Sequence, residues 1–596
     1  MSSEPSRAQK PDSYATMWKK VDSLLKQAGL PGSALTEINK IYSLAKKEKN
    51  QPQLIKAISY KAAINDENEE DGDILNIKML EKEIADLPQP GKSILYSITA
   101  ERYWNYFQNN RWKLYSRTET SDKVSDNITT WGPEDFHKKI TAYYDASLSA
   151  SDLLYKTPVN NFDTILAIGN VRHLRPTLFD LLCFRALKYF ESDELTITRP
   201  KDRFTLSAPQ AFSPAADFVN HEFSSTDSLS NHLKALKLYQ RLLKLHLNDK
   251  EPDALIDADL NRLGFVNIYS THPQSDSLYI SAVRKIADKY QQLPAAAQAW
   301  YLIADDHAQK ASLYDPLSDT THRYEYLKAI KICEEVLKQK DSSEGKTNCM
   351  ILLQNIKEQS LELTTEKVNL PDQAFRTLVS YKNVGKIYVR IIPVTKEMIN
   401  HLGNAYEDKY WASLVSLKPI KTYTHNLPAT GDYQRHYTEI ATDGLPVGEY
   451  AFLVSSDQDF NFVTAPAAVH FFHVSAISYI HKDDNYYVLH RETGKPLGNA
   501  AVEVYTRVYN YGTQKEELRR LGTYYTNAQG YVKLDRINGK SSQPIQLAIR
   551  HEKDFLHLND TRYSVTRNNG FDSERKEEIK TYLFTDRSIY RPGQTV

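Results

Sequence analysis

Cysteine is scarce in this sequence, whose 596 residues include Cys183, Cys333 and Cys349 and no other cysteine. An odd number of cysteines at wide spacing excludes a disulfide framework and the paired-cysteine knuckle of a zinc site. Cys183 and Cys333 lie inside helical patterns, so we expect small, buried hydrophobic side chains at these positions. A Cys333–Cys349 bridge is the alternative.

An excess of charge of one sign is also missing. Lys and Arg total 75, Asp and Glu total 75, and the net charge is zero. This balance argues against a nucleic-acid or membrane-surface partner selected by bulk charge. No apolar run approaches the roughly 20 residues that a bilayer-spanning helix needs. A hydrophobic content of 41% suffices for packed cores, and roughly 150 residues per domain predicts about four domains.

The first residues, MSSEPSRAQKPD, lack the apolar stretch of a signal peptide. We therefore interpret residues 1–14 as a flexible polar leader. Such a leader is typical of the segment that follows the lipidated cysteine of a bacterial lipoprotein. A lipid anchor at a missing N-terminal cysteine, whose place Met1 takes, stays an open alternative.

Glycine is rare in the first part of the chain. Residues 1–365 hold 8 of the 21 glycines, and residues 366–596 hold the other 13. The spacing of apolar residues changes at the same place, from a helical period to alternation. We therefore predict a multidomain chain, α then β, in which residues 15–365 form a helical domain.

Apolar residues recur at helical spacing before this boundary. Leucines form such a stripe in HLKALKLYQRLLKLHL (residues 232–247), and YEYLKAIKICEEVLKQ (residues 324–339) has a similar one. Between them, the alanine-rich residues 293–311 favour close packing of neighbouring helices. Helical hairpins of this kind bury their apolar faces by stacking on one another, so we predict a TPR-like α-solenoid.

A further helix is predicted in RPTLFDLLCFRALKYF (residues 175–190), which is apolar on most sides and so belongs near the centre of the domain. Pro176 is expected in its first turn, where a missing N–H costs nothing. Residues 191–228 are rich in Ser, Pro, Asp and Thr without a lasting period, and we predict a long loop there.

After residue 366 the apolar residues alternate, as they do in half-buried strands. The first predicted unit, residues 366–475, has strands in KIYVRII (386–392), LPVGEYAFLVSS (445–456) and VHFFHV (469–474). A second unit, residues 476–582, begins with NYYVLHRETGKPLGNAAVEVYTRVY. Each unit has the size of an antiparallel β-sandwich of about 100 residues.

Two turns are predicted in the second unit. TGKP (residues 493–496) and NAQG (residues 527–530) carry the residue types that tight turns prefer. We predict that GTYYTNAQGYVKL (residues 522–534) is a β-hairpin closed by the second of these turns.

The chain ends in TDRSIYRPGQTV (residues 585–596). The run around Ile589 favours a strand, Pro592 presets φ at the first central position of a turn, and Gly593 supplies the positive φ of the second. This pattern predicts a strand, a tight turn and the start of another strand. We interpret residues 583–596 as the truncated opening of a further β-domain, and the chain as the front part of a longer protein.

This string resembles the TD-x-x-IYRPG-x-TV opening of a macroglobulin domain in the α2-macroglobulin family. The residues that carry the resemblance are Thr585, Asp586, Ile589, Tyr590, Arg591, Pro592 and Gly593. TGKPLGNAAVEVY with TNAQGYVKL is similar to the macroglobulin-type domain before such an opening, and LPVGEYAFLVSS is similar to the closing strand of the domain before that. The helical front with RPTLFDLL is similar to the N-terminal extension of Bacteroidetes-type members.

The resemblance implies that both β-sandwiches are macroglobulin-like domains and that the chain is the N-terminal part of a bacterial protease trap, an endopeptidase inhibitor. It implies an exported protein, periplasmic or anchored at the outer membrane, whose partners are target proteases or cell-envelope proteins. The helical region would then act in docking or spacing. No cofactor is implied.

Many members of this family capture proteases through a thioester in a Cys-Gly-Glu-Gln motif. Here Cys183 precedes Phe, Cys333 precedes Glu and Cys349 precedes Met. No thioester residue is therefore assigned within this chain.

Three segments have a superficial likeness to ligand-binding motifs. PGKS (residues 90–93) has Asp86 where a phosphate loop needs glycine. NDENEEDGD (residues 65–73) lacks the sixth-position glycine of a calcium loop, and HEKDFLH (residues 551–557) has the wrong spacing for two zinc ligands on one helical face. We predict a turn that opens a helix, a solvated turn between helices, and a strand with a surface loop. We expect the 17 histidines at surfaces and interfaces.

No catalytic, cofactor-binding or metal-binding residue is assigned, and we expect a protein that is not an enzyme. Two alternatives to the protease trap stay open. One is a non-inhibitory scaffold of the cell envelope that binds proteins through the solenoid, and the other is an enzyme without a recognisable catalytic motif.

Overall fold

The computed structural model describes residues 13–558, apart from residues 28, 70, 116–126, 168, 170, 194–202, 228, 483, 513 and 535–543, together with residues 562 and 563. For residues 400, 510, 515, 516, 544, 562 and 563 it describes the backbone alone. The chain forms two compact units, Met1–Ile303 with Glu334–Cys349, and Ala304–Cys333 with Met350–Val596. The division passes through the helices α13 (Ala297–Ala311), α14 (Glu325–Leu337) and α15 (Glu344–Lys357).

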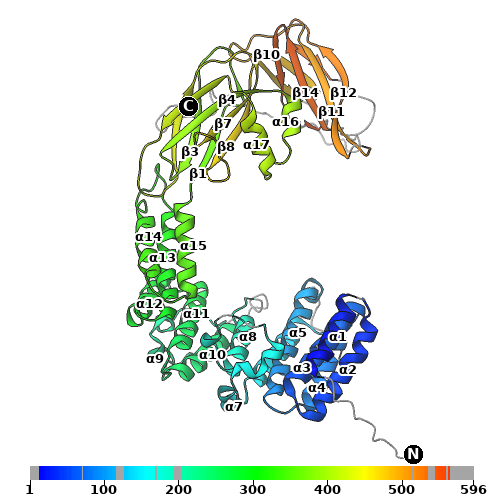
Figure 1. The fold of residues 1–596 in the computed structure, drawn as a ribbon, viewed down its shortest axis with the longest axis vertical. Helices are drawn as coiled ribbons and strands as arrows, with labels where there is room; N and C mark the ends of the chain where they lie inside the picture. The colour runs from blue at the N-terminus through cyan, green and yellow to red at the C-terminus, as the bar shows by residue number, and fades with distance from the viewer. Residues whose placement is uncertain are drawn as a thin grey trace, which may run out of the picture. The chain divides into compact units, whose positions relative to one another are not determined.

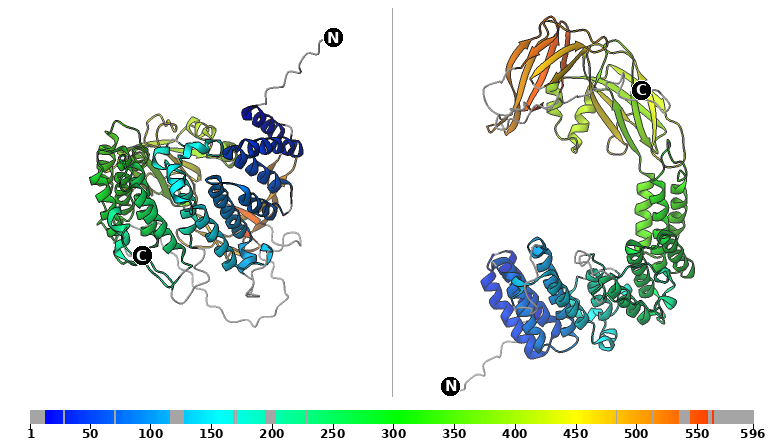
Figure 2. Two further views of the ribbon diagram at one scale, coloured as in Figure 1. Left: turned by 90° about the horizontal axis from the view of Figure 1, so that it is seen from below. Right: turned by 180° about the vertical axis from the view of Figure 1, so that it is seen from behind.

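The first unit is helical, and its first helices stack side by side in chain order (Figures 1 and 2). They are α1 (Tyr14–Lys26), α2 (Pro31–Glu48), α3 (Gln51–Asn68), α4 (Gly72–Asp86) and α5 (Gly91–Tyr115). Val21, Ile38 and Ala57, from three successive helices, meet in one buried cluster. The Asn50 side chain accepts a hydrogen bond from the N–H of Gln53 and so caps the start of α3.

The remaining helices of this unit continue the same pairwise packing, α5 with α6, α8 with α10, and α10 with α11. They are α6 (Pro133–Ser147), α7 (Ser151–Lys156), α8 (Leu178–Phe190), α9 (Ala215–Phe218), α10 (Asn231–His246), α11 (Asp253–Tyr269) and α12 (Ser275–Lys289). Short 3-10 helices join them: η1 (Ile128–Thr130), η2 (Val159–Ile165), η3 (Arg172–Leu174), η5 (Pro209–Phe212) and η6 (Pro294–Ala296). The predicted helical front is confirmed, and its stacking is that of an α-solenoid.

Helix α8 is central, as predicted, because most of its side chains are buried. The placement of Pro176 in its first turn was wrong, since the helix begins at Leu178. The Thr177 hydroxyl accepts from the N–H of Asp180 at 3.2 Å, and Asp180 accepts from the N–H of Thr177 at 2.8 Å. This capping box fixes the helix start, and Pro176 lies outside it.

Residues 191–228 are not a loop throughout, because η5 and α9 lie within them. The fully buried Arg262 of α11 holds the end of η5 in place. Its guanidinium donates to the carbonyl oxygens of Ala211 and Ser213, and it pairs with Asp259 at 2.6 Å. The prediction of a long loop failed here because the ordering side chain comes from a helix later in the sequence.

The three cysteines are fully buried and form no disulfide bond with one another. They act as small hydrophobic side chains, as expected, and the alternative of a Cys333–Cys349 bridge is contradicted.

The strands of the second unit begin at Ser360 and form two sandwiches (Figure 1). In the first, a three-stranded sheet of order β1-β3-β6 faces a five-stranded sheet of order β2-β8-β7-β4-β5. The strands are β1 (Ser360–Thr365), β2 (Val368–Asn369), β3 (Phe375–Lys382), β4 (Lys386–Val394), β5 (Lys421–Asn426), β6 (His436–Thr442), β7 (Gly448–Ser455) and β8 (Ala467–Val474). All pair antiparallel except β2 with β8.

The central strands of the first sandwich are buried on both faces. Alternate residues such as Ile387 and Phe452 point into the core between the two sheets. The other set, including Ile392 and Leu453, packs beneath the helices α16 (Lys396–Leu402) and α17 (Asp408–Ser416). This double burial explains why LPVGEYAFLVSS is an almost continuous apolar run.

The second sandwich has a three-stranded sheet of order β13-β10-β9 and a five-stranded sheet in which β12, β11, β14 and β15 are neighbours and β16 pairs with β14. The strands are β9 (Ile477–Lys482), β10 (Asn485–His490), β11 (Ala501–Asn510), β12 (Lys515–Tyr525), β13 (Tyr531–Lys533), β14 (Pro544–His551), β15 (Asp554–His557) and β16 (Arg562–Tyr563). Val502 and Val504 of β11 lie in its core. The predicted order of helices followed by antiparallel β-sandwiches is thus confirmed.

The predicted hairpin over residues 522–534 was wrong. The turn at residues 527–530 forms, since the N–H of Gly530 donates to the carbonyl oxygen of Asn527 at 2.9 Å. However, β12 pairs with β11 in one sheet, and β13 pairs with β10 in the other. The Thr526 hydroxyl accepts from the N–H of Ala500 at 2.8 Å, so the strand before the turn stays in its own sheet. The turn therefore crosses from one sheet to the other.

The two sandwiches share a residue. Val368 of β2 pairs with β8 in the first sandwich, yet its side chain belongs to the core cluster of the second. Near the connection, the N–H of Ala476 donates to Asp554 at 2.7 Å. These contacts join the sandwiches into a single packed body.

Candidate functional site: a groove in the helical unit

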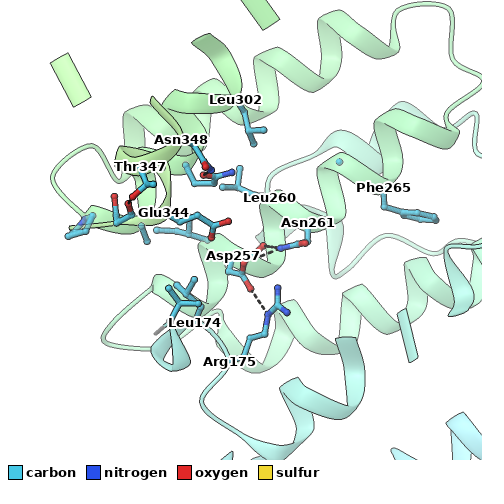
Figure 3. Close-up of a pocket in the computed structure, with 18 of the residues that line it drawn as sticks. Leu174, Arg175, Asp257, Leu260, Asn261, Phe265, Leu302, Glu344, Thr347 and Asn348 are labelled. Carbon is cyan, nitrogen blue, oxygen red and sulfur yellow. Dashed lines mark hydrogen bonds and ion pairs between the residues drawn. The ribbon is translucent and has the colours of Figure 1, made fainter. Parts of the chain in front are cut away.

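A large hollow of the first unit is a groove between helices, with a volume of about 1000 Å³ (Figure 3). Helix α11 forms one wall, and the starts of α13 and α15 form the other. Residues from η3 and the following Arg175 lie at one end. The groove is therefore built from segments that are far apart in the sequence.

The α11 wall is a stripe of residues at helical spacing. Asp257, Leu260, Asn261, Gly264 and Ile268 all line the groove. Nothing lies within 4 Å of the position that a Cβ atom on Gly264 would take. Ile268 is 73% exposed although it is aliphatic. This face of α11 thus carries apolar surface and open space that no described part of the chain covers.

The opposite wall depends on a close approach of two helices. A Cβ atom on Gly345, in the first turn of α15, would lie 2.1 Å from the backbone of Ala297 at the start of α13. Glycine is therefore required for this packing. Across the contact, the Asn348 side chain donates from Nδ2 to Oε1 of Gln298 at 3.0 Å. Both amide side chains face the groove from fixed positions.

An ion pair closes one end of the groove (Figure 3). Arg175 Nε donates to Asp257 Oδ2 at 3.1 Å, and Asn261 donates to Asp257 Oδ1 at 3.1 Å. The Arg175 guanidinium also lies 3.6 Å from the centre of the Phe184 ring. Burial raises the pKa of the Asp257 carboxyl, and the nearby Arg175 charge opposes that rise.

The groove carries more acidic than basic side chains. Glu191, Asp257 and Glu344 line it, against Arg175 and His173. Glu191 accepts a hydrogen bond from the Tyr239 hydroxyl at 2.6 Å, and burial raises the pKa of its carboxyl. Because Arg175 is paired with Asp257, the groove favours a positively charged occupant.

A second hollow, the junction pocket, lies between the two β-sandwiches and has a volume of about 1050 Å³. Lys396 of α16 donates from Nζ to Nε2 of His557 of β15 at 2.9 Å. Burial and the nearby charges of Lys396, His473 and Arg550 lower the pKa of His557 to about 4. Burial likewise lowers the pKa of Lys396 to about 8. The Lys396–His557 hydrogen bond therefore joins the two sandwiches while the imidazole of His557 is neutral.

The signature residues Thr585, Asp586, Ile589, Tyr590, Arg591, Pro592 and Gly593 lie outside the described residues. Of the three segments with a likeness to ligand-binding motifs, PGKS opens α5, and NDENEEDGD includes the last residues of α3 and the first of α4. HEKDFLH contains the end of β14, a turn and the whole of β15. The predicted helix opening and strand are confirmed. The predicted turn between helices was too long, because α3 extends to Asn68 and α4 begins at Gly72. The expectation of surface and interface histidines was incomplete, because His137 and His246 are buried within the helical unit.

Sequence reasoning missed the groove altogether. One signal was available, namely Gly264 inside the otherwise apolar helical segment DALIDADLNRLGFVNIY. A glycine at mid-helix costs stability and calls for a reason. The sequence around Gln298 and Asn348, which line the opposite wall, has no motif that would place these residues across from α11.

Within the described parts of the chain, no group of three or more His, Cys, Asp or Glu side chains is placed to hold a metal ion. No helix among the described residues has the length and apolar character that crossing a membrane requires.

No protein-family model and no curated protein matches the sequence. Among solved structures, the chain is similar to native α2-macroglobulin from Escherichia coli spanning domains MG0-NIE-MG1, with 16% identity and a TM-score of 0.24. That match covers 34% of this chain and 63% of the other, so the chain spans less than two thirds of it. It is also similar to red sea bream transglutaminase, with 10% identity, a TM-score of 0.18 and coverage of 36% and 34%. A third match, the S-layer protein rSbsC, has 10% identity, a TM-score of 0.11 and coverage of 80% and 56%.

Proposed function

We propose that this chain is the N-terminal part of an α2-macroglobulin-like endopeptidase inhibitor of the bacterial cell envelope. The observation that carries the proposal is the order of parts: a helical unit, then two β-sandwiches in tandem, then the IYRPGQTV string. The segments that resemble macroglobulin domains coincide with strands, since LPVGEYAFLVSS contains β7 and AVEVY lies in β11. In this proposal the chain is not an enzyme, and the trapping devices lie in other parts of the protein.

The helical unit would serve as a docking or spacing module for the sandwiches. Its stacked helices give an extended surface, and the groove on α11 offers a place for a partner. The proposed location is the periplasm or the outer membrane, with a lipid anchor before the polar leader. The proposed partners are target proteases and proteins of the cell envelope.

Limited proteolysis of the longer protein that contains this chain tests the trap. A single cut in a bait segment should make the protein more compact, which native gels and sedimentation velocity would detect as faster migration. The 596-residue chain, treated with the same protease, serves as the control and should show no such shift. A longer protein that is nicked without any change in sedimentation would contradict the proposal.

The α11 groove favours one alternative, a scaffold that binds envelope proteins without trapping proteases. A protease trap and a scaffold would respond differently to proteolysis. A scaffold would bind its partner equally well before and after the cut, whereas a trap changes shape when it is cut. Intact binding with unchanged sedimentation would therefore support the scaffold.

A further inference from the structure

We propose that the α11 groove binds an extended peptide segment of another protein, one that carries a Lys or Arg side chain next to an aliphatic residue. The proposal goes beyond protease inhibition and does not depend on it, because it rests on the described residues of the helical unit. It assigns a ligand class to a surface for which the sequence suggested none.

The groove has the length and volume of a short peptide. From Asp257 to Ile268 the α11 wall runs for about 16 Å, at roughly 1.5 Å per residue. That length accommodates about five residues of extended chain, at roughly 3.3 Å each. A volume of about 1000 Å³ exceeds what one side chain fills and matches a short peptide.

Gly264 leaves open space on the α11 wall of the groove. Alanine at this position would favour the helix, and nothing in the described chain lies within 4 Å of its Cβ position. The glycine therefore serves no packing need of the protein itself. A smooth wall without a side chain lets the backbone of a bound segment approach α11 closely.

The wall opposite α11 presents two amide side chains, those of Gln298 and Asn348. The bond between Asn348 and Gln298 uses the Nδ2 group of the first and the Oε1 atom of the second. No other described residue is hydrogen-bonded to Oδ1 of Asn348 or Nε2 of Gln298, so both atoms can bond to a ligand. One acceptor beside one donor is the complement of a peptide unit, which offers one N–H and one C=O.

Glu344 and Ile268 supply the charge and the apolar surface that would select the side chains of a bound peptide. Glu344, an exposed residue in the first turn of α15, faces the groove in Figure 3. Its carboxylate favours a Lys or Arg side chain at the α15 side. The exposed Ile268 offers apolar contact to an aliphatic neighbour on the same peptide, above the buried Leu260 that also lines the groove.

Selection from a random library tests the proposal on the full 596-residue chain. Phage-displayed heptapeptides are selected on the wild type and depleted on the variant Gly264→Leu, whose side chain fills the groove. Sequences with Lys or Arg beside Val, Ile or Leu should be enriched. Synthetic, fluorescein-labelled versions should then bind the wild type at least tenfold more tightly than Gly264→Leu, as measured by fluorescence anisotropy. An absence of enrichment, or enrichment of acidic peptides, would overturn the proposal.

Matched variants separate charge from folding. Glu344→Gln should weaken binding of the basic peptide at least fivefold and reduce the salt dependence of binding. Glu67→Gln changes an exposed acid that does not line the groove and should alter neither. Gly264→Ala, which adds a single methyl group, provides a folded comparison for Gly264→Leu by circular dichroism. Equal binding by Glu344→Gln and the wild type would contradict the assigned charge.

A last comparison distinguishes a peptide from a small cation. The groove should read the peptide backbone through Gln298 and Asn348, so N-acetyl-lysine methylamide should displace the labelled peptide at least a hundredfold less well than the unlabelled heptapeptide does. Displacement at similar concentrations would mean that the groove binds a small cation and would refute the peptide assignment.

Discussion

At the scale of single residues, some buried polar side chains of the helical unit bond to groups on neighbouring elements. Asp180 shows this well, because it caps α8 through Thr177 and also pairs with the buried His246 of α10 at 2.8 Å. Arg262 of α11 donates to the carbonyl oxygens of Ala211 in η5 and of Ser213, the residue that follows η5. Such networks fix one arrangement of the helices, since a half-satisfied network is costly.

Arg262→Ala should destabilise the helical unit strongly. The substitution leaves Asp259, which is 5% exposed, without the Arg262 cation and removes the donor to the carbonyl groups of Ala211 and Ser213. A loss of about 3–5 kcal/mol in the free energy of unfolding is expected. Urea denaturation followed by far-UV circular dichroism measures it. Arg284→Ala, on the exposed face of α12, is the control and should stay within about 0.5 kcal/mol of the wild type. A similar small effect for both variants would show that the Arg262 network is not needed.

At the scale of secondary-structure elements, the spacing of apolar residues predicted most helices and strands. The pairing of strands that are distant in the sequence could not be predicted from it. The helices α8, α10 and α14 and the strands β4, β7 and β11 follow from the spacing of their own apolar residues. The crossing between β12 and β13 does not, because the turn at residues 527–530 looks the same in a hairpin. Sheet partners are set by packing against strands elsewhere in the chain.

The groove was unpredictable for the same reason. Its walls come from η3, α11, α13 and α15, and only their packing brings Asp257 opposite Asn348. The junction pair is similar, since Lys396 and His557 are separated by 161 positions in the chain. HEKDFLH was predicted as a strand with a surface loop. The strand is confirmed, but nothing in the segment indicated that its last histidine is buried against the first sandwich.

Two glycines in the second sandwich give a matched test of the crossing turn. Gly530→Ala should be costly, because φ is +69° and the new Cβ would lie 2.4 Å from the carbonyl oxygen of Val488 in the other sheet. A loss of more than about 2 kcal/mol is expected, against roughly 1 kcal/mol for Gly494→Ala, where φ is also positive but the space is open. Thermal unfolding monitored by near-UV circular dichroism compares them. Equal losses would mean that the turn does not lie against β10.

Gly264→Ala should have the opposite sign. The helix α11 gains an alanine at mid-helix and meets no obstacle, so stability should rise by up to about 1 kcal/mol. Urea denaturation of the full chain measures the change. A destabilised Gly264→Ala variant would show that the chain itself needs this space, and would remove one support for the groove as a binding site.

At the scale of the whole molecule, the two sandwiches behave as one body because they share Val368 and the Lys396–His557 pair. This junction makes the second unit sensitive to acid. His557 has a folded-state pKa of about 4, below the value near 6.5 of an unfolded chain. The folded state therefore binds fewer protons, and stability is lost as the pH falls from about 6.5 to 4.

His557→Gln should flatten this pH dependence. Glutamine keeps an acceptor for Lys396 but does not titrate, so the part of the wild-type loss that comes from His557 should disappear. Allowing for solvent screening, that part is on the order of 1–2 kcal/mol between pH 6.5 and 4. Tm values of the wild type and the variant, measured across this range, should converge toward acid pH. Parallel curves would show that His557 is not protected from protonation in the folded protein.

The proposal for the whole protein is that this chain begins a protease trap, and its most direct test is dependence on substrate size. The longer protein that contains this chain is mixed with a protease, and the rates of cleavage of casein and of a chromogenic tripeptide are measured in the same sample. The account predicts that cleavage of casein falls at least tenfold while cleavage of the tripeptide stays within about a factor of two. Unchanged cleavage of casein, or equal loss on both substrates, would contradict it.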